Sequence, residues 1–263
     1  MGQNFLTDAS VPRHIAESSL ADDASAVLEI GPGIGCLTKE LSALASRVCS
    51  VELDRRLLPV LNESLADCGN VEIISGDILK TDIDALIDSR FDGLAPRVCA
   101  NLPYNITTPV LSKLIDSRRF ETITVMIQRE VARRICAAPG TADYGAFTVY
   151  VNYYTEPEIL FDVSPSCFIP QPKVTSSVVR MVKRSSPPAA VKSDELFFRL
   201  VKASFSQRRK TLLNAVSSFF PEIGKEKLSE LIEKCGFDIR IRGETLGISE
   251  FAMLANMLAD EIK

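Results

Sequence analysis

The chain has 263 residues, which is enough for one sizeable core and a small appended domain. Hydrophobic residues make up 46% and charged residues 24%, and no apolar run approaches the roughly 18 residues that a membrane span requires. The net charge of −4 argues against a protein that binds nucleic acid through an overall positive charge.

Cysteine and histidine usage argues against a metal site. The seven cysteines are dispersed without a Cys-x-x-Cys pair, and His14 is the only histidine, so we predict no bound metal. Dispersed, unpaired cysteines are typical of small core residues in a reduced, cytoplasmic protein. The first residues also lack the charged and apolar regions of a signal peptide.

The first 185 residues alternate between predicted helices and predicted strands. The helices are expected at 11–20, 36–44, 55–65, 83–87, 109–116 and 128–136. The strands are expected at 26–30, 47–51, 71–75, 97–100, 122–127, 146–153 and 174–182. This alternation predicts an α/β fold with a mostly parallel, doubly wound sheet, in which the last two strands form a closing antiparallel pair.

A proline- and serine-rich stretch at 185–190 reads as a linker. Beyond it, helices are expected at about 194–205, 208–218, 225–234 and 249–261. The sequence therefore predicts two domains: an α/β domain over 1–185 and a small all-helical domain over 186–263.

A glycine-rich turn follows the first strand and opens a helix. Gly31, Gly33 and Gly35 let the backbone pass close to a ligand there. A dinucleotide-binding fingerprint would place its third glycine at position 36, where the chain has Cys36, and this departure weakens an NAD interpretation. By itself the turn is also compatible with an ordinary tight connection from strand to helix.

Acidic side chains follow at the ends of the next two strands. Glu52 can accept hydrogen bonds from two ribose hydroxyls, and Asp77 can accept one from an adenine amino group. The carboxyl ends of parallel strands are where ligands bind in open α/β sheets. A pocket rich in acids and carbonyls suits the cationic donor S-adenosylmethionine (SAM), and we predict SAM rather than NAD.

The fourth strand ends in Asn101-Leu102-Pro103-Tyr104, which forms the candidate reaction slot. The Asn101 side-chain oxygen and the Leu102 carbonyl can accept hydrogen bonds from an amino group. The rigid ring of Pro103 fixes the turn, and Tyr104 can stack on a planar base. We interpret this slot as a site where an adenine amino group is methylated.

These motifs resemble those of class I SAM-dependent methyltransferases that modify adenine amino groups. Further motifs narrow the resemblance to the ribosomal RNA adenine dimethylases of the small-subunit type. These are Gly2-Gln3-Asn4-Phe5-Leu6, Tyr144-Gly145, Phe168-Ile169-Pro170-Gln171-Pro172-Lys173-Val174, Phe205-Ser206-Gln207-Arg208-Arg209-Lys210 and Arg242-Gly243-Glu244-Thr245-Leu246. Members of this family usually carry a longer and often basic leader, so we expect either an upstream start or the lack of that arm.

The resemblance implies roles for individual residues. SAM-binding positions carry over onto Asn4, Leu6, Gly31, Gly33, Glu52, Asp77 and Asn101. Catalytic positions carry over onto Asn101, Leu102, Pro103 and Tyr104, and a base-stacking position onto Phe168. The alternatives are that Tyr104 is a core aromatic residue and that Phe168 is an apolar loop anchor, which for Phe168 taken alone is the simpler interpretation. Beside the four-residue motif we favour stacking. Stacking from both sides would hold an adenine that has left its helix.

Positive charge is concentrated beyond the linker. Residues 1–185 hold 18 lysines and arginines against 23 acids, whereas residues 186–263 hold 12 against 11. Between 199 and 210 there are five basic residues and no acid, which favours a phosphate-binding stripe over a solvated helix face. The residues that we expect to contact RNA are Arg129, Arg199, Lys202, Arg208, Arg209 and Lys210.

The resemblance implies N6,N6-dimethylation of two adjacent adenosines in a hairpin loop near the 3′ end of small-subunit (16S) rRNA, during ribosome biogenesis. The expected enzyme is a monomer whose partner is the rRNA of the immature small subunit. One alternative is a large-subunit rRNA adenine methylase of the resistance type, and another is a ribosome assembly factor with little catalysis. DNA adenine methylation is a more distant possibility.

Overall fold

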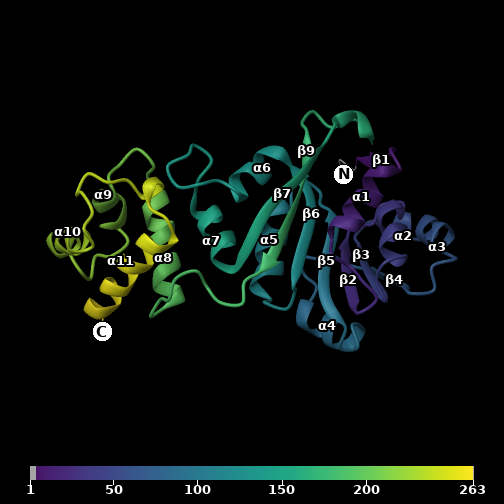
Figure 1. Ribbon diagram of the computed structural model, residues 1–263, viewed down its shortest axis with the longest axis horizontal. Helices are drawn as coiled ribbons and strands as arrows, with labels where there is room; N and C mark the ends of the chain where they lie inside the picture. The colour runs from purple at the N-terminus through teal and green to yellow at the C-terminus, as the bar shows by residue number, and fades with distance from the viewer. Residues whose placement is uncertain (1–3, 263) are drawn as a thin grey trace. The chain divides into compact units, whose positions relative to one another are not determined.

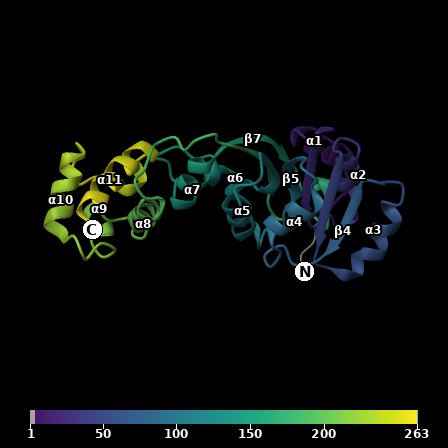
Figure 2. The same cartoon turned by 90° about the horizontal axis from the view of Figure 1, so that it is seen from below.

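The computed structural model describes residues 4–262, which form two compact units (Figures 1 and 2). The first unit extends to Ala132 and resumes over Glu156–Lys183, and the second comprises Arg133–Thr155 and the chain from Arg184 onward. This division differs from the single boundary predicted at 185/186, because residues 133–155 pack within the helical unit. Gly2 and Gln3 of the amino-terminal motif lie outside the described residues.

The first unit is built on a seven-stranded sheet with the order β4-β3-β2-β5-β6-β9-β7. The strands are β2 (Ser25–Ile30), β3 (Arg47–Glu52), β4 (Val71–Ser75), β5 (Ala95–Asn101), β6 (Thr122–Gln128), β7 (Thr155–Val163) and β9 (Ser176–Lys183). Neighbours from β4 to β6 are parallel, and β9 is antiparallel to β6. All six residues of β2 are buried, as expected for a central parallel strand covered on both faces. The predicted α/β sheet is confirmed.

The helices of the first unit are α1 (Ser10–Ser18), α2 (Cys36–Ser42), α3 (Leu58–Ser64), α4 (Ile83–Arg90), α5 (Thr107–Asp116) and the first residues of α6 (Arg129–Ile135). Apolar side chains of α1 and α2 form a core cluster with β2, β3, β5, β6 and β9. A separate two-stranded ribbon pairs β1 (Phe5–Leu6) with β8 (Phe168–Ile169), placing Leu6 opposite Phe168. The amino-terminal segment is thereby joined to a loop more than 150 residues away.

The second unit is helical and has its own core. Its helices are α7 (Ala146–Tyr154), α8 (Asp194–Phe205), α9 (Leu212–Val216), α10 (Lys225–Lys234) and α11 (Ile248–Glu261). The core is rich in aromatic residues, including Tyr153, Phe197, Phe220 and Phe251, each of which is at most 1% exposed.

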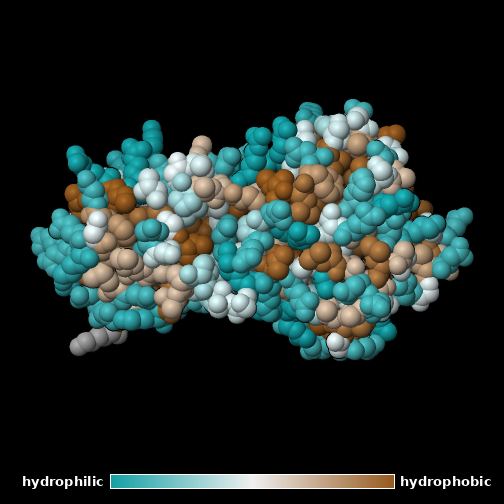
Figure 3. Space-filling view, in the orientation of Figure 1, coloured by the Kyte–Doolittle hydropathy of each residue, from teal (hydrophilic) through white to brown (hydrophobic). Residues whose placement is uncertain are grey.

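The visible surface is largely hydrophilic, with apolar residues in small patches (Figure 3). Among the described residues, no helix combines the length and apolar character that crossing a membrane would require.

The strand predicted at 146–153 is wrong, because this segment forms helix α7. Its β-branched and aromatic residues favour strands in isolation, but packing decides the outcome. Val149 and Tyr153, one helical turn apart, are both buried in the helical core, where Tyr153 stacks on Phe197 with ring centroids 4.9 Å apart. The hydroxyl of Thr148 also accepts a hydrogen bond from the amide of Gly145 at the start of the helix. The strand that lies beside β9 is β7 instead.

Candidate active site

A cavity of about 290 Å³ opens at the carboxyl ends of β2, β3, β4 and β5. The predicted site residues that line it are Asn4, Gly31, Gly33, Glu52, Asp77, Asn101, Leu102, Pro103, Tyr104 and Phe168. Leu6 is absent from the lining and packs instead against the core cluster beside Phe168. The structure therefore brings nearly all of the residues predicted for cofactor and slot into one place.

The glycine turn has a backbone conformation that explains its composition. Gly31, Gly33 and Gly35 have φ angles of +68°, +62° and +90°, in the left-handed region that L-residues with a Cβ rarely adopt. A Cβ on Gly33 would lie 3.5 Å from the ring of Phe5, so the amino-terminal strand lies directly against this turn. Phe5 also lines the cavity, and its position between Asn4 and Leu6 in the motif was the signal that could have identified it.

Glu52 is held in place by backbone donors. It is 3% exposed, its Oε1 accepts a hydrogen bond from the amide of Asp54 at 2.7 Å, and its Oε2 accepts one from the amide of Gly33 at 3.4 Å. Each carboxylate oxygen has more than one lone pair, so both can still accept from a ligand. Asp77 is oriented in the same manner, because its Oδ1 accepts from the amide of Leu79 at 3.0 Å.

Glu29, which the sequence analysis did not identify, lies on β2 two residues before the glycine turn. It is 1% exposed, and its Oε2 accepts hydrogen bonds from the hydroxyls of Thr38 on α2 and Ser50 on β3, both at 2.7 Å. Burial raises the pKa of this carboxyl to about 7, although the hydrogen bonds from the two hydroxyls lower it. The charge of Glu52 also raises the pKa. A single acid inside the apolar run Ala26 to Ile30 was the available signal.

The slot residues are fixed by hydrogen bonds at three points. The amide of Leu102 donates to the carbonyl of Met126 on β6 at 3.1 Å, and the Pro103 carbonyl accepts from the amide of Ile106 at 3.2 Å. The Tyr104 hydroxyl lies 2.8 Å from the hydroxyl of Ser176 on β9. The loop after β5 is thus tied to β6 and β9, which gives the slot a defined shape.

Phe168 is more buried than a base-stacking role suggests. Its side chain is 1% exposed and belongs to the core cluster with Ile15 and Val178, although it also lines the cavity. The adjacent Ile169 is 65% exposed, as expected from the alternation of side chains along a strand. Stacking by Phe168 stays a prediction, and this loop anchors the cavity wall in the structure.

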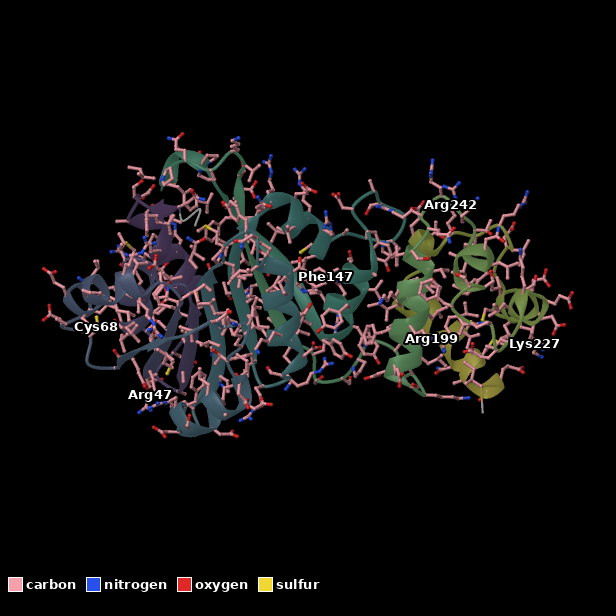
Figure 4. All side chains as sticks on the ribbon, turned by 180° about the vertical axis from the view of Figure 1, so that it is seen from behind. Arg47, Cys68, Phe147, Arg199, Lys227 and Arg242 are labelled. Atoms are coloured by element: carbon pink, nitrogen blue, oxygen red, sulfur yellow. The ribbon has the colours of Figure 1, made fainter. Side chains whose placement is uncertain are left out.

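The predicted basic stripe separates into two groups. Arg199 lies on α8 (Figure 4). It forms an ion pair with Glu222 at 2.9 Å, donates to the Phe219 carbonyl and lies 4.3 Å from the ring centre of Phe220. Arg208 donates to the Ala142 carbonyl at 2.8 Å. Both guanidinium groups are therefore engaged within the helical unit.

The remaining predicted cations are more accessible. Lys202, Arg209 and Lys210 are exposed, and they have no ion pair to any residue in the described part of the chain. Arg129, at the start of α6 in the first unit, is half-exposed and lies 3.6 Å from Asp162. Exposed lysines and arginines of this kind can contact RNA phosphates with little rearrangement.

The sheet order, the glycine turn after β2 and the acids at the ends of β3 and β4 define a class I SAM-dependent methyltransferase fold. The chain belongs to the ribosomal RNA adenine dimethylase family, whose model matches residues 1–258. This confirms the family to which the sequence motifs pointed.

Named relatives agree with that membership, and solved structures share the fold. The chain is 47% identical to "Ribosomal RNA small subunit methyltransferase A" of Geobacillus thermodenitrificans, over 98% of this chain and 89% of the relative. It is 44% identical to the protein of the same name from Alkaliphilus oremlandii, over 100% and 92%. The crystal structure of a dimethyladenosine transferase from Plasmodium falciparum has the same fold, with a TM-score of 0.85, 24% identity and 98% of each chain covered. The 23S rRNA methyltransferase ErmE gives a TM-score of 0.75 at 26% identity, covering 97% of this chain and all of that one.

Proposed function

We propose that the protein dimethylates the N6 amino groups of two adjacent adenosines in a hairpin loop near the 3′ end of small-subunit (16S) rRNA. The observation that carries this proposal is that Asn101, Leu102, Pro103 and Tyr104 line the same cavity as the glycine turn and its acids. One cavity can thereby hold a methyl donor beside an adenine. The names of relatives more than 40% identical over nearly the full length support the small-subunit target.

The residues of the cavity fit SAM. Glu52, with both oxygens oriented by backbone amides, would accept from the ribose hydroxyls, and Asp77 would accept from the adenine amino group of the cofactor. Asn4 and the backbone of Gly31 and Gly33 complete this wall. When bound, SAM supplies an electrophilic methyl group, and S-adenosylhomocysteine is the product that leaves. No metal is part of the proposal, because its charge stabilisation comes from acids and carbonyls.

The slot would prepare the acceptor by hydrogen bonding. The lone pair of an adenine amino nitrogen is delocalised into the ring, which makes this nitrogen a weak nucleophile. In the first methylation, hydrogen bonds donated by its two N–H groups to the Asn101 side-chain oxygen and the Leu102 carbonyl favour a pyramidal nitrogen with a localised lone pair. Catalysis then depends on alignment and electrostatics, and the proton is lost to water without a strong side-chain base.

RNA binding is assigned to the accessible cations Arg129, Lys202, Arg209 and Lys210. They would hold the rRNA of an immature small subunit, with an unstacked loop base entering the slot. We place the enzyme in the cytoplasm, acting as a monomer during ribosome biogenesis.

The test is incubation with labelled SAM and either unmethylated small or unmethylated large ribosomal subunits, followed by nucleoside mass spectrometry. Dimethyladenosine is expected only in small-subunit RNA. The full-length likeness to ErmE is the observation that favours the large-subunit alternative, and dimethyladenosine confined to large-subunit RNA would establish it. Binding to immature small subunits without any methylated product would instead support an assembly factor.

A further inference from the structure

The Tyr104 side chain has a partner outside the four-residue slot. Its hydroxyl lies 2.8 Å from the Ser176 hydroxyl, and Ser176 is fully buried as the first residue of β9. Tyr104 itself is half-buried and lines the cavity. A buried hydroxyl directed at the tip of a cavity-lining ring can set the position of that ring.

The two ends of this contact differ in how firmly they are held. Ser176 lies opposite Gln128 in the β6–β9 register, and the preceding Thr175 carbonyl accepts from the amide of Arg129 at 3.0 Å. Tyr104 belongs to the connection between β5 and α5, which lies outside the hydrogen-bonded strands of the sheet. The Ser176 contact therefore ties a ring on a loop to a fixed point of the sheet.

We propose that Ser176 is a positioning residue for the methyl acceptor, because its hydroxyl holds the Tyr104 ring as one wall of the base slot. This inference rests on the proposed function and adds a residue to its site. The chain that follows Phe168, the second predicted wall of the slot, leads into β9 at Ser176. A shift of either wall would move the base relative to Asn101.

Loss of the contact is expected to act on the rate and to spare the binding of the donor. Small displacements of reacting groups are costly to rate, and one buried hydrogen bond corresponds to about a ten-fold effect. Glu52 and Asp77, which we assign to SAM, form no hydrogen bond with Ser176 in the described structure. The KM for SAM is therefore expected to change less than about two-fold.

The experiment uses the full chain with four variants: Tyr104→Phe, Ser176→Ala, their double variant and the control Ser25→Ala. Ser25 matches Ser176, because it too is fully buried and opens a strand, but its hydroxyl donates to the Asp22 carbonyl. Single-turnover methylation of unmethylated small subunits should be about ten-fold slower in each of the first two variants. The double variant should be no slower than the slower single variant, and Ser25→Ala should match the wild type.

A second measurement detects the contact without any turnover. The chain has five tyrosines, so fluorotyrosine labelling gives few ¹⁹F resonances, and the Tyr104→Phe variant assigns the one from Tyr104. Ser176→Ala should shift that resonance, whereas Ser25→Ala should not. Tyr104→Phe keeps the ring volume and so remains informative if Ser176→Ala fails to fold.

The outcomes separate the two proposals. Wild-type rates in both single variants, or multiplicative losses in the double variant, would overturn the positioning role while leaving the proposed function in place. A wild-type chain that transfers no methyl group to either subunit would overturn the proposed function and the positioning role with it. In that case the ¹⁹F shift would report a structural hydrogen bond only.

Discussion

At the scale of single residues, Asn101 combines two demands, because it ends β5 and supplies the polar atom of the slot. We predict that Asn101→Ala lowers methyl transfer at saturating SAM by at least about a hundred-fold, since both alignment and polarisation of the acceptor are lost. Its half-buried side chain is polar and contributes little to the core, so far-UV circular dichroism and the unfolding midpoint should be unchanged. Near-normal activity in this variant would contradict the mechanism.

The buried Glu29 makes stability depend on pH. Its pKa is about 7 in the folded protein against an ordinary value of 4.5, so between these pH values the folded state binds more protons than the unfolded state. Unfolding free energy should therefore decrease as pH rises from about 4.5 to 7, by about 3 kcal/mol, and change little from this cause above pH 7.

Glu29→Gln tests this effect, because an amide oxygen can still accept from Thr38 and Ser50. Urea unfolding between pH 5 and 8 should show a smaller decrease for the variant than for the wild type. The variant should be more stable than the wild type at pH 8. Parallel pH curves for the two proteins would show that Glu29 stays ionised when folded.

Two residue-scale roles were beyond the reach of the sequence. The five basic residues between 199 and 210 look alike in one dimension, yet Arg199 and Arg208 are engaged within the helical unit. Their partners at Phe219, Glu222 and Ala142 come from other turns and loops. The glycine turn, Glu52, Asp77 and the slot were predictable because each follows a strand, and parallel strands place their carboxyl ends together.

At the scale of elements, the accessible cations and the cations engaged within the helical unit are expected to give different effects when they are substituted. Arg209→Ala combined with Lys210→Ala should weaken RNA binding and reduce the slope of log K against log salt by about two, because two phosphate contacts are lost. Arg199→Ala should instead lower the unfolding temperature of the helical unit. Filter binding at several salt concentrations and thermal unfolding would distinguish these effects, and SAM binding should be retained in both variants. A double variant with an unaltered salt slope would remove these two residues from the RNA interface.

The packing of α8 against the turn at Gly243 gives a stability prediction. A Cβ on Gly243 would lie 2.7 Å from the Ser204 Cβ and 2.8 Å from its carbonyl oxygen. Gly243→Ala should therefore lower the unfolding free energy by about 1–3 kcal/mol through overpacking. Gly69→Ala is the control, since nothing lies within 4 Å of its added methyl group, and the two are compared by urea unfolding. Equal stabilities would show that α8 can move away at no cost.

Most helices and strands could be predicted from the sequence, and the exceptions have a physical cause. The segment 146–153 has strand propensity but becomes α7, because its apolar face meets Phe197 from a helix some 45 residues later. β7 was missed because Glu156, Pro157 and Glu158 interrupt its apolar pattern. Edge strands tolerate such residues, and β7 lies at the end of the sheet.

At the scale of the whole molecule, the two units are not consecutive stretches of chain. Residues 133–155 belong to the helical unit although they precede β7 and β9. A fragment cut at residue 185 would leave Tyr144, Val149 and Tyr153 without the helical core that buries them. We predict that this fragment binds a hydrophobic dye strongly and unfolds at a lower temperature than the α/β unit does in the full chain. Substituting serine for Val149 and Tyr153 in the fragment should reduce dye binding, and an unsubstituted fragment with little dye binding would contradict this account.

The placement of β9 between β6 and β7 determines the order in which the sheet can form while the chain is synthesised on the ribosome. The sheet cannot be completed until β9 has left the exit tunnel, because β7 has no neighbour in the sheet before then. Ser176, which contacts Tyr104, and the Phe168 segment that pairs with β1 emerge at the same late stage. A nascent chain thus carries its glycine turn and its slot motif for some 70 residues before the cavity acquires its last wall. An enzyme built in this order becomes competent only once its catalytic unit is nearly complete, and chain fragments that terminate early leave the slot unassembled.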